Sequence, residues 1–373
     1  MWEYDFNNSI YETDIQQAVS VLLPWEKLCN KSILITGASG MIASVIIDIL
    51  MYRNLHYDQQ VHITALSRNE KKARARFVQY WDSEYFRYVS CDISEVGSFM
   101  DKREFIKTAD YILHAASNTH PVAYSTDPVG TITANIFGTY NLLKYASEYH
   151  CSRFLLFSSV EIYGENRGNV DRFDEGYLGY IDCNTLRSGY PESKRLSESM
   201  CNAFAAKSGQ DFVIGRFSRV YGPTMLEDDS KAIAQFIRKA SAGEDVVLKS
   251  EGNQLYSYTY VVDAAVAAFY LLLKGESGKA YNVADESSDI TLKELAETLS
   301  ETVGSKVVFE LPEAAEKAGY SSATKATLDG SRLRGLGWSA KTPIKEGLAK
   351  TIKLIGDRYE YSGITGRRSG SNL

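Results

Sequence analysis

Two hydroxyls and a carboxylate follow a short apolar run in the middle of the chain. Ser158, Ser159 and Glu161 come directly after residues 154–157, which read FLLF and are typical of a buried strand. A carboxylate at the end of a buried strand is costly unless it is paired or takes part in chemistry. We interpret this stretch as a candidate catalytic segment, and a structural salt bridge at Glu161 is the alternative.

A tyrosine and a lysine with helical spacing follow further along the chain. Tyr190 and Lys194 lie four residues apart in segment 187–195, RSGYPESKR, so on a helix they share one face. A nearby ammonium stabilises a phenolate and lowers the pKa of the tyrosine toward neutral pH. Such a tyrosine can accept a proton from a substrate hydroxyl or return one. A Tyr-x-x-x-Lys pair is common, so its meaning depends on the elements around it.

A glycine-rich turn near the start of the regular part of the chain predicts a dinucleotide site. Segment 36–44, TGASGMIAS, follows the apolar run 32–35 and opens a helical pattern. Gly37 permits a tight turn, Gly40 lets the backbone approach a pyrophosphate, and Ala43 permits close helix–strand packing. A plain glycine turn is the alternative.

The residues after the next two strands bear on which dinucleotide binds. An acid after the second strand would bind the ribose 2′-hydroxyl of NAD, but the chain has Ser67 and Arg68 there, which can accept the 2′-phosphate of NADP. A solvated surface charge is the equal alternative for Arg68. After the third strand, Asp92 is placed either to meet the adenine or to cap a turn before Ile93.

Strand-like and helix-like segments alternate through the first two thirds of the chain. Strands are expected over 32–35, 61–66, 86–90, 110–115, 153–158 and 212–217, with helices between them, notably over 41–53, 69–80, 130–148 and 190–207. Continuous apolar strands alternating with helices predict an α/β Rossmann fold with a doubly wound parallel sheet covered on both faces. Shorter elements follow, with a strand over 258–262 and helices over 231–242, 263–274, 292–303 and 343–356.

These patterns divide the 373 residues into four parts. Residues 1–30 form an N-terminal extension with a helix expected over 15–23, and 31–221 form the NAD(P)-binding domain. Residues 222–360 form a smaller C-terminal α/β substrate lobe, with some segments returning to the sheet. The tail 361–373 is expected to be disordered.

Composition excludes several classes of protein. A net charge of −6 and a pI of about 5.6 argue against nucleic acid or an anionic membrane as the main partner. The five cysteines are odd in number and contain no CxxC, and the five histidines show no metal-ligand spacing. No apolar run reaches about 18 residues. We expect a cytoplasmic protein without a metal.

Taken in order, these segments resemble the extended short-chain dehydrogenases/reductases that modify nucleotide sugars, the NAD-dependent epimerase/dehydratase family. The resemblance spans about 31–355 and also includes HAASNTHP (114–121), ANIFGTYNLL (134–143), RVYGPTM (219–225) and YSYTYVVDAA (256–265). It implies an enzyme that binds a nucleotide sugar and NAD, with NADP left open. It also implies a homodimer through the helices at 130–148 and 190–207, and ordinary sheet-covering helices are the equal alternative for these two segments.

The resemblance implies roles for individual residues. Tyr190 is expected to be the catalytic base, Lys194 to lower its pKa and hold the nicotinamide ribose, and Ser159 to bond the reacting sugar hydroxyl. The other residues expected to bind the cofactor are Gly37, Ser39, Gly40, Met41, Ile42, Ser67, Arg68, Asp92, Ile93, Ala115, Ala116, Ser117 and Asn135. Those expected to bind the substrate are Asn118, Ser159, Glu161, Arg219 and Tyr256.

Glu161 helps to choose among the reactions of the family, which start by oxidising sugar C4 to a ketone. Dehydratases carry an Asp-Glu pair where this chain has Val160-Glu161, and valine cannot donate a proton, so 4,6-dehydration is disfavoured. The pattern of a hydroxyl residue, any residue and then Glu, here Ser159-Val160-Glu161, resembles that of the UDP-glucuronate decarboxylases. Segment 127–143 is also similar to that branch of the family. We expect an epimerase or decarboxylase. The alternatives are an NADPH-dependent keto-sugar reductase, a 4,6-dehydratase or a non-catalytic NAD(P)-binding protein.

Two positions depart from the family's pattern. Tyr256 stands where the family usually has an Arg that binds the diphosphate or, in decarboxylases, the sugar carboxylate. Arg219 stands where the family usually has an Asn. Because tyrosine cannot supply a cationic fork, we hypothesise that Arg219 takes over the phosphate contact from a different strand.

Overall fold

The computed structural model describes residues 9–95, 97, 99, 102, 106, 109–119, 121–310 and 323–361. Its centre is a seven-stranded sheet, in the order β10-β6-β5-β4-β1-β2-β3, in which every neighbouring pair is parallel. The strands are β1 (Ser32–Thr36), β2 (His62–Ser67), β3 (Phe86–Ser90), β4 (Tyr111–His114), β5 (Arg153–Ser159), β6 (Phe212–Phe217) and β10 (Lys279–Val283). The predicted Rossmann sheet is confirmed.

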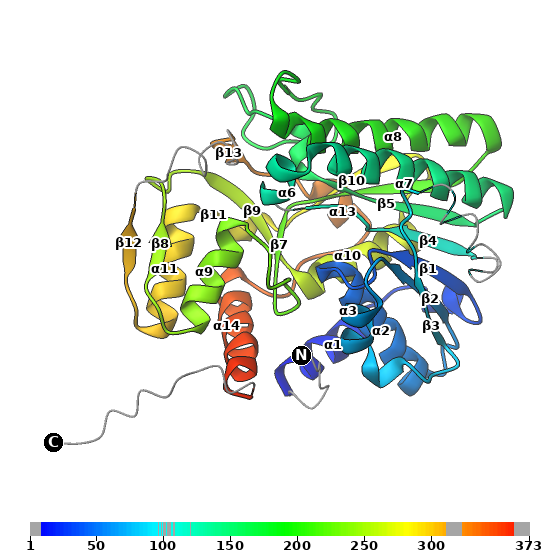
Figure 1. Cartoon of the computed structure of the whole chain (residues 1–373), viewed down its shortest axis with the longest axis horizontal. Coiled ribbons are helices and arrows are strands. Elements are labelled where there is room, and N and C mark those ends of the chain that lie inside the picture. Colours follow the sequence, from blue (N-terminus) through cyan, green and yellow to red (C-terminus); the bar gives the residue numbers. More distant parts are fainter. Residues whose placement is uncertain are drawn as a thin grey trace.

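Helices cover both faces of this sheet (Figure 1). One face carries α7 (Pro128–Glu148) and α8 (Gly189–Ser208), and the other carries α1 (Ser9–Val19), α2 (Met41–Tyr57) and α10 (Val261–Lys274). Each face has its own apolar core, one built around Leu34, Ile112 and Leu156, and the other around Ile33, Ile35 and Leu155. The strands are apolar at successive positions because both faces are buried.

The C-terminal lobe lies beside the carboxyl edge of the sheet (Figure 1). In it, β9 pairs with β7, β11 and β13, and β8 pairs with β12. The strands are β7 (Arg219–Tyr221), β8 (Val246–Leu248), β9 (Leu255–Tyr260), β11 (Asp289–Thr291), β12 (Val307–Phe309) and β13 (Lys325–Ala326). The helices are α9 (Ala232–Ser241), α11 (Leu292–Val303), α13 (Ser331–Gly335) and α14 (Ile344–Tyr361). Between α10 and α11 the chain returns to the main sheet as β10.

Short elements complete the connections. They are α3 (Glu70–Arg76), α6 (Pro121–Thr126), η1 (Trp25–Leu28), η2 (Val78–Tyr80), η3 (Val160–Tyr163), η4 (Leu186–Ser188) and η5 (Glu286–Ser288). The helix expected over 69–80 is therefore divided into α3 and η2, with Phe77 as the C-cap of α3. The strand expected over 258–262 is also misplaced, because β9 ends at Tyr260 and Val261 already begins α10.

The helix expected over 15–23 is α1, which begins earlier, at Ser9, and ends at Val19. It is held by buried polar contacts to both halves of the molecule. Asp14 accepts hydrogen bonds from the Tyr260 hydroxyl (2.7 Å) and from Lys350 Nζ (2.8 Å) of α14. At its start, the Tyr11 hydroxyl donates to Asp48 Oδ2 of α2 (2.5 Å). Of the tail predicted to be disordered, residues 362–373 lie outside the described residues, as do 1–8.

Candidate functional site

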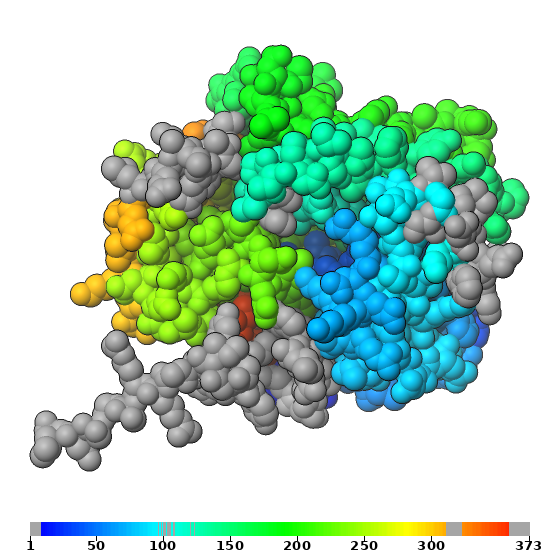
Figure 2. Space-filling model, viewed as in Figure 1, coloured from blue at the N-terminus to red at the C-terminus, as the bar shows by residue number. Residues whose placement is uncertain are grey.

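A cavity of about 630 Å³ lies at the carboxyl edge of the main sheet and extends to the C-terminal lobe. Figure 2 shows a hollow in this face, between residues of the lobe (lime) and the N-terminal half (blue). Its lining includes the turns that follow β1, β2, β3, β4 and β5, and residues of β7, β8 and β9. This edge is where ligands bind in open parallel sheets.

The glycine turn forms one end of the cavity. Gly37 has φ of +65°, and a Cβ there would lie 2.8 Å from the Ala116 Cα, so only glycine fits. Gly40 is the N-cap of α2, and both glycines line the cavity together with Met41 and Ile42. The free N–H groups of the first turn of α2 thus lie where an anionic pyrophosphate can bind.

Charged residues line the cavity just after β2 and just after β3. Arg68 is largely exposed, and its guanidinium lies 3.8 Å from Asp92 Oδ2 and 3.4 Å from Asn118 Oδ1. Asp92 Oδ1 also accepts hydrogen bonds from the backbone N–H and hydroxyl of Ser94. Asp92 therefore stabilises the turn after β3 and faces the cavity at the same time.

Almost all residues predicted to bind cofactor or substrate line this one cavity. Those that do are Gly37, Ser39, Gly40, Met41, Ile42, Ser67, Arg68, Asp92, Ile93, Ala115, Ala116, Ser117, Asn118, Ser159, Glu161, Tyr190, Lys194, Arg219 and Tyr256. Asn135 does not line it and is buried, with 1% of its surface exposed. Its amide accepts from Ser117 Oγ (2.8 Å) and donates to Ser193 Oγ (2.9 Å), and so joins the loop after β4 to α8.

The hydroxyl, phenol and ammonium predicted to act together lie at the other end of the cavity. Ser159 ends β5 and caps η3, where its Oγ accepts from the Glu161 N–H (3.2 Å). Tyr190 and Lys194 share the face of α8 that meets this strand end, and Lys194 Nζ donates to the Phe157 carbonyl (2.9 Å). Burial raises the pKa of Tyr190 to about 12, while a hydrogen bond with Ser159 acts to lower it. Burial lowers the pKa of Lys194 to about 8.

Glu161 lies between two arginines. Its carboxylate is 2.9 Å from Arg187 Nη1 and 3.6 Å from Arg219 Nη2, and all three side chains are about four-fifths buried. Burial tends to raise the pKa of Glu161, but the two arginines outweigh it and hold the pKa below its ordinary value. One carboxylate faces two guanidinium groups, so this end of the cavity carries net positive charge. Glu161 therefore both forms salt bridges and lines the cavity.

The two unusual positions of the sequence meet at this cluster. Strands β7 and β9 pair so that Arg219 is opposite Tyr258, which places Arg219 and Tyr256 on one face. The Arg219 guanidinium lies 3.5 Å from the centre of the Tyr256 ring. Its Nη1 is buried without a hydrogen-bond partner among the described residues. The guanidinium is thus held beside Glu161 and can donate a hydrogen bond to a further anionic group.

Sequence reasoning missed several lining residues. Arg187 belongs to the RSGYPESK segment, three positions before Tyr190, and its position just before a helix was its only signal. Tyr124 stacks on Tyr190, but nothing in the sequence around it marks this contact. The lobe contributes Lys231, Lys249, Ser250 and Gln254, whose roles depend on how the lobe packs.

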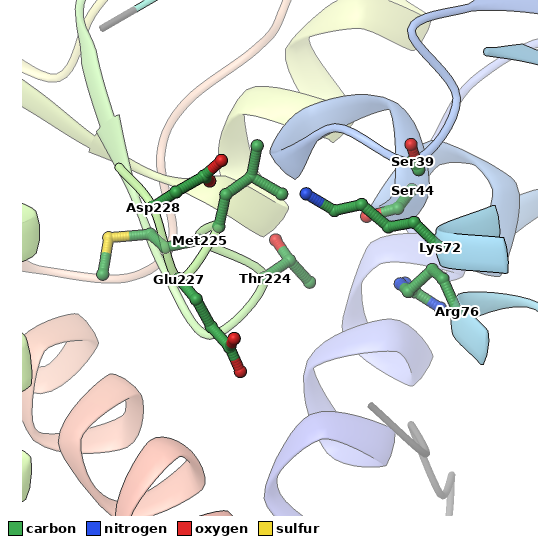
Figure 3. Close-up of a pocket in the computed structure, with 9 residues that line it drawn as sticks. Ser39, Ser44, Lys72, Arg76, Thr224, Met225, Glu227 and Asp228 are labelled. Carbon is green, nitrogen blue, oxygen red and sulfur yellow. The ribbon is translucent and has the colours of Figure 1, made fainter. Parts of the chain in front are cut away.

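A side cavity of about 290 Å³ adjoins the main cavity beside the glycine turn (Figure 3). Ser39, Lys72, Leu226 and Asp228 line both spaces. Lys72 extends from α3 toward the loop that carries Thr224 and Asp228 (Figure 3). Thr224 Oγ1 donates to the Met41 carbonyl (3.0 Å), so this loop is attached to the start of α2.

Neither a metal-binding cluster nor a membrane-spanning helix is found in the part of the chain that the structure describes. Among the described residues, no group of three or more His, Cys, Asp or Glu could hold a metal ion. Within the same part of the chain, no helix combines the length and apolar character that crossing a membrane requires.

Comparison with known proteins gives consistent matches. The sequence model of the NAD dependent epimerase/dehydratase family matches residues 33–284. UDP-glucuronic acid decarboxylase 1 of Danio rerio is 28% identical over 334 residues, or 89% of this chain and 74% of that protein. UDP-glucuronic acid decarboxylase 6 of Arabidopsis thaliana is 29% identical over 327 residues, or 86% of this chain and 87% of that protein.

Solved structures share the fold. The UDP-glucose 4-epimerase of Thermotoga maritima has a TM-score of 0.75 at 21% identity, over 88% of this chain and 99% of that one. The dTDP-glucose 4,6-dehydratase of Streptomyces venezuelae, solved with NAD bound, has a TM-score of 0.75 at 22% identity, over 88% of this chain and 98% of that one.

Proposed function

This chain belongs to the NAD-dependent epimerase/dehydratase family, and we propose that it converts a nucleotide sugar through a transient 4-keto sugar. The observation that carries this proposal is the convergence of Ser159, Tyr190 and Lys194 in one cavity whose far end is the Gly37–Gly40 turn. A dinucleotide and a sugar can therefore meet within one cavity.

The residues at the glycine turn fit the cofactor of the family. A pyrophosphate fits at Gly37, Gly40 and the first turn of α2, where a Cβ on Gly37 would collide with the backbone of Ala116. Ser67, Arg68 and Asp92 would hold the adenosine, and Lys194 the nicotinamide ribose. NAD, when bound, supplies the hydride acceptor for the oxidation of sugar C4.

The protein's own groups carry the proton of this oxidation. Tyr190 is the base that takes the proton of the C4 hydroxyl, and Ser159 positions that hydroxyl. Because burial holds the pKa of Tyr190 at about 12, its phenolate is a strong base that depends on neighbouring hydrogen-bond donors. Returning the same proton at the end of the reaction restores the enzyme.

We infer that the sugar is a uronic acid and that the second step is decarboxylation. The cluster of Glu161, Arg187 and Arg219 carries net positive charge and includes an Arg219 N–H that no described residue satisfies, which favours a substrate carboxylate. A ketone at C4 makes the C6 carboxylate that of a β-keto acid. The C5–C6 bond then breaks, CO2 leaves, and the electron pair forms an enolate that is protonated at C5. Val160 offers no acid for the rival 4,6-dehydration.

One observation favours a second candidate, an NADPH-dependent reductase of a keto sugar. The β2 end of the cavity carries Ser67 and Arg68, with no acid at the position that would bind a ribose 2′-hydroxyl. A reductase would need the same Ser159 and Tyr190 to deliver a proton to the carbonyl oxygen. The two candidates differ in whether the cofactor is consumed.

We also propose a homodimer formed through α7 and α8. Phe137 and Tyr140 on α7 and Leu196 on α8 are 49%, 46% and 44% exposed. A second copy of the same helix pair would cover these side chains. Sedimentation at micromolar concentration should give twice the chain mass, and a monomer would contradict the proposal.

A substrate screen tests the proposed reaction. The protein with NAD is given UDP-glucuronate labelled with ¹³C at C6, UDP-glucose, and a 4-keto sugar with NADPH. Decarboxylation predicts labelled CO2 and a UDP-pentose from the first substrate alone, with no net NADH, and no product from Tyr190→Phe. Consumption of NADPH without CO2 release would favour the reductase and contradict decarboxylation.

A further inference from the structure

Tyr124 of α6 lies against Tyr190, the proposed base of the reaction. Its ring stacks on that of Tyr190 with centroids 4.6 Å apart and planes inclined by 21°. The two side chains are 7% and 5% exposed, and both line the cavity. A parallel ring at this distance leaves the Tyr190 ring little room to tilt. Its orientation is therefore fixed by α6 as well as by its own helix.

The groups around this pair come from every neighbouring element. Glu161 faces it from η3 and Arg187 from η4, with the Arg187 guanidinium carbon 5.8 Å from the centre of the Tyr124 ring. Asp229 faces Tyr124 from the loop before α9, and Lys194 lies on the same face of α8 as Tyr190. The charge of Glu161 raises the pKa of Tyr190 and that of Arg187 lowers it, and the effect of Glu161 is the larger of the two.

We propose that Tyr124 is a positioning residue for proton transfer: its ring orients Tyr190, and its hydroxyl donates a hydrogen bond to the Tyr190 oxygen. This inference rests on the proposed function, because it assigns a role relative to Tyr190 as the base. Burial raises the pKa of Tyr124 well above its ordinary value. Burial also raises the pKa of Tyr190 to about 12, while the hydrogen bond from Tyr124 acts to lower the pKa of Tyr190. The hydrogen bond from Tyr124 thus favours the phenolate form of Tyr190 relative to its protonated form.

The chain offers a matched control for removing this hydroxyl. Tyr145 and Tyr149 also lie with ring centroids 4.6 Å apart, with their planes tilted by 31°, near the end of α7 and outside the cavity. Tyr149→Phe therefore makes the same chemical change in a ring pair with the same centroid separation. Tyr124→Phe keeps the stacked ring and loses the hydroxyl, and Tyr124→Leu loses both.

The first test is the pH dependence of turnover in the four proteins. For Tyr124→Phe we expect the pKa of the acidic limb to rise by about one unit, since a hydrogen bond to a phenolate is lost. Below that limb kcat should fall about tenfold, with KM within twofold of wild type. Tyr124→Leu should lose more of its kcat than Tyr124→Phe, and Tyr149→Phe should have the kcat and pH profile of wild type. A raised KM with an unchanged pH profile would assign Tyr124 to substrate binding and overturn the proposal.

The second test needs no sugar and separates this inference from the proposed function. In NAD-saturated protein with ¹³Cζ-labelled tyrosine, the resonance missing from Tyr190→Phe reports Tyr190. Its titration midpoint should rise in Tyr124→Phe and stay in place in Tyr149→Phe. An unchanged midpoint would overturn the role of Tyr124, even if wild type turns over its sugar. If no nucleotide sugar reacts, the proposed function fails, and this titration still decides the role of Tyr124.

Discussion

Removing Arg219 should weaken the binding of a sugar carboxylate specifically. Its Nη2 lies 3.6 Å from Glu161, and its side chain is 17% exposed. At an effective dielectric constant of about 20, two unit charges at such a distance interact by about 4–5 kcal/mol before desolvation and screening. Measured hydrogen bonds to charged groups contribute about 1.5–3 kcal/mol. We therefore expect Arg219→Ala to weaken UDP-glucuronate binding by about 10- to 150-fold.

Calorimetric titration of UDP-glucuronate and UDP into wild type and variants measures this effect. The affinity for UDP should stay within twofold, because UDP lacks the carboxylate. Arg167 also stacks on a tyrosine, with its guanidinium carbon 4.2 Å from the ring centre of Tyr180, but outside the cavity, so Arg167→Ala is the matched control. An unchanged affinity for UDP-glucuronate would refute the reasoning. An equal loss for UDP would instead place Arg219 on the diphosphate, as the sequence alone suggested.

Two further predictions concern the scaffold of the site. Gly37→Ala should weaken NAD binding more than tenfold and lower Tm, because the new Cβ meets the Ala116 backbone at 2.8 Å. Gly209 is the matched control, since it has φ of +71° but no atom within 4 Å of an added Cβ. Gly209→Ala should therefore lower Tm without changing NAD affinity. Full NAD affinity in Gly37→Ala, measured by fluorescence titration, would contradict this account. Burial lowers the pKa of His114 to about 3, below the ordinary 6.5, so the unfolded chain takes up this proton first as pH falls. Stability from His114 is therefore complete above pH 6.5 and is lost progressively toward pH 3, by about 3 kcal/mol at pH 4. Urea unfolding at pH 7 and 4 measures this loss of stability. The difference between the two pH values should be smaller in His114→Gln than in wild type or in the exposed control His56→Gln. Equal differences in all three proteins would contradict this role of His114.

Local pattern was enough to predict the elements that carry the chemistry. The strands over 86–90 and 212–217 match β3 and β6, because apolar runs bounded by turn residues leave little choice. Gly37 could be predicted because its conformation is dictated by its own turn. Tyr190 and Lys194 could be placed on one face because their spacing is that of a helix.

Contacts that depend on pairing between distant elements could not be predicted. Glu161 meets Arg219 only because β7 pairs with β9, and the sequence does not specify this register. Tyr124 reaches Tyr190 through the packing of α6 against the start of α8. The docking of α1 rests on Asp14, whose partners lie hundreds of positions away.

The most direct test of the central claim follows a deuterium atom at sugar C4. UDP-glucuronate carrying deuterium at C4 is turned over by the protein with unlabelled NAD, and the product is examined by mass spectrometry and NMR. A transient 4-keto sugar with a retained cofactor predicts a UDP-pentose that carries the deuterium at C4 and a primary isotope effect on turnover. Product that lacks the deuterium, with label in released NADH, would contradict the claim.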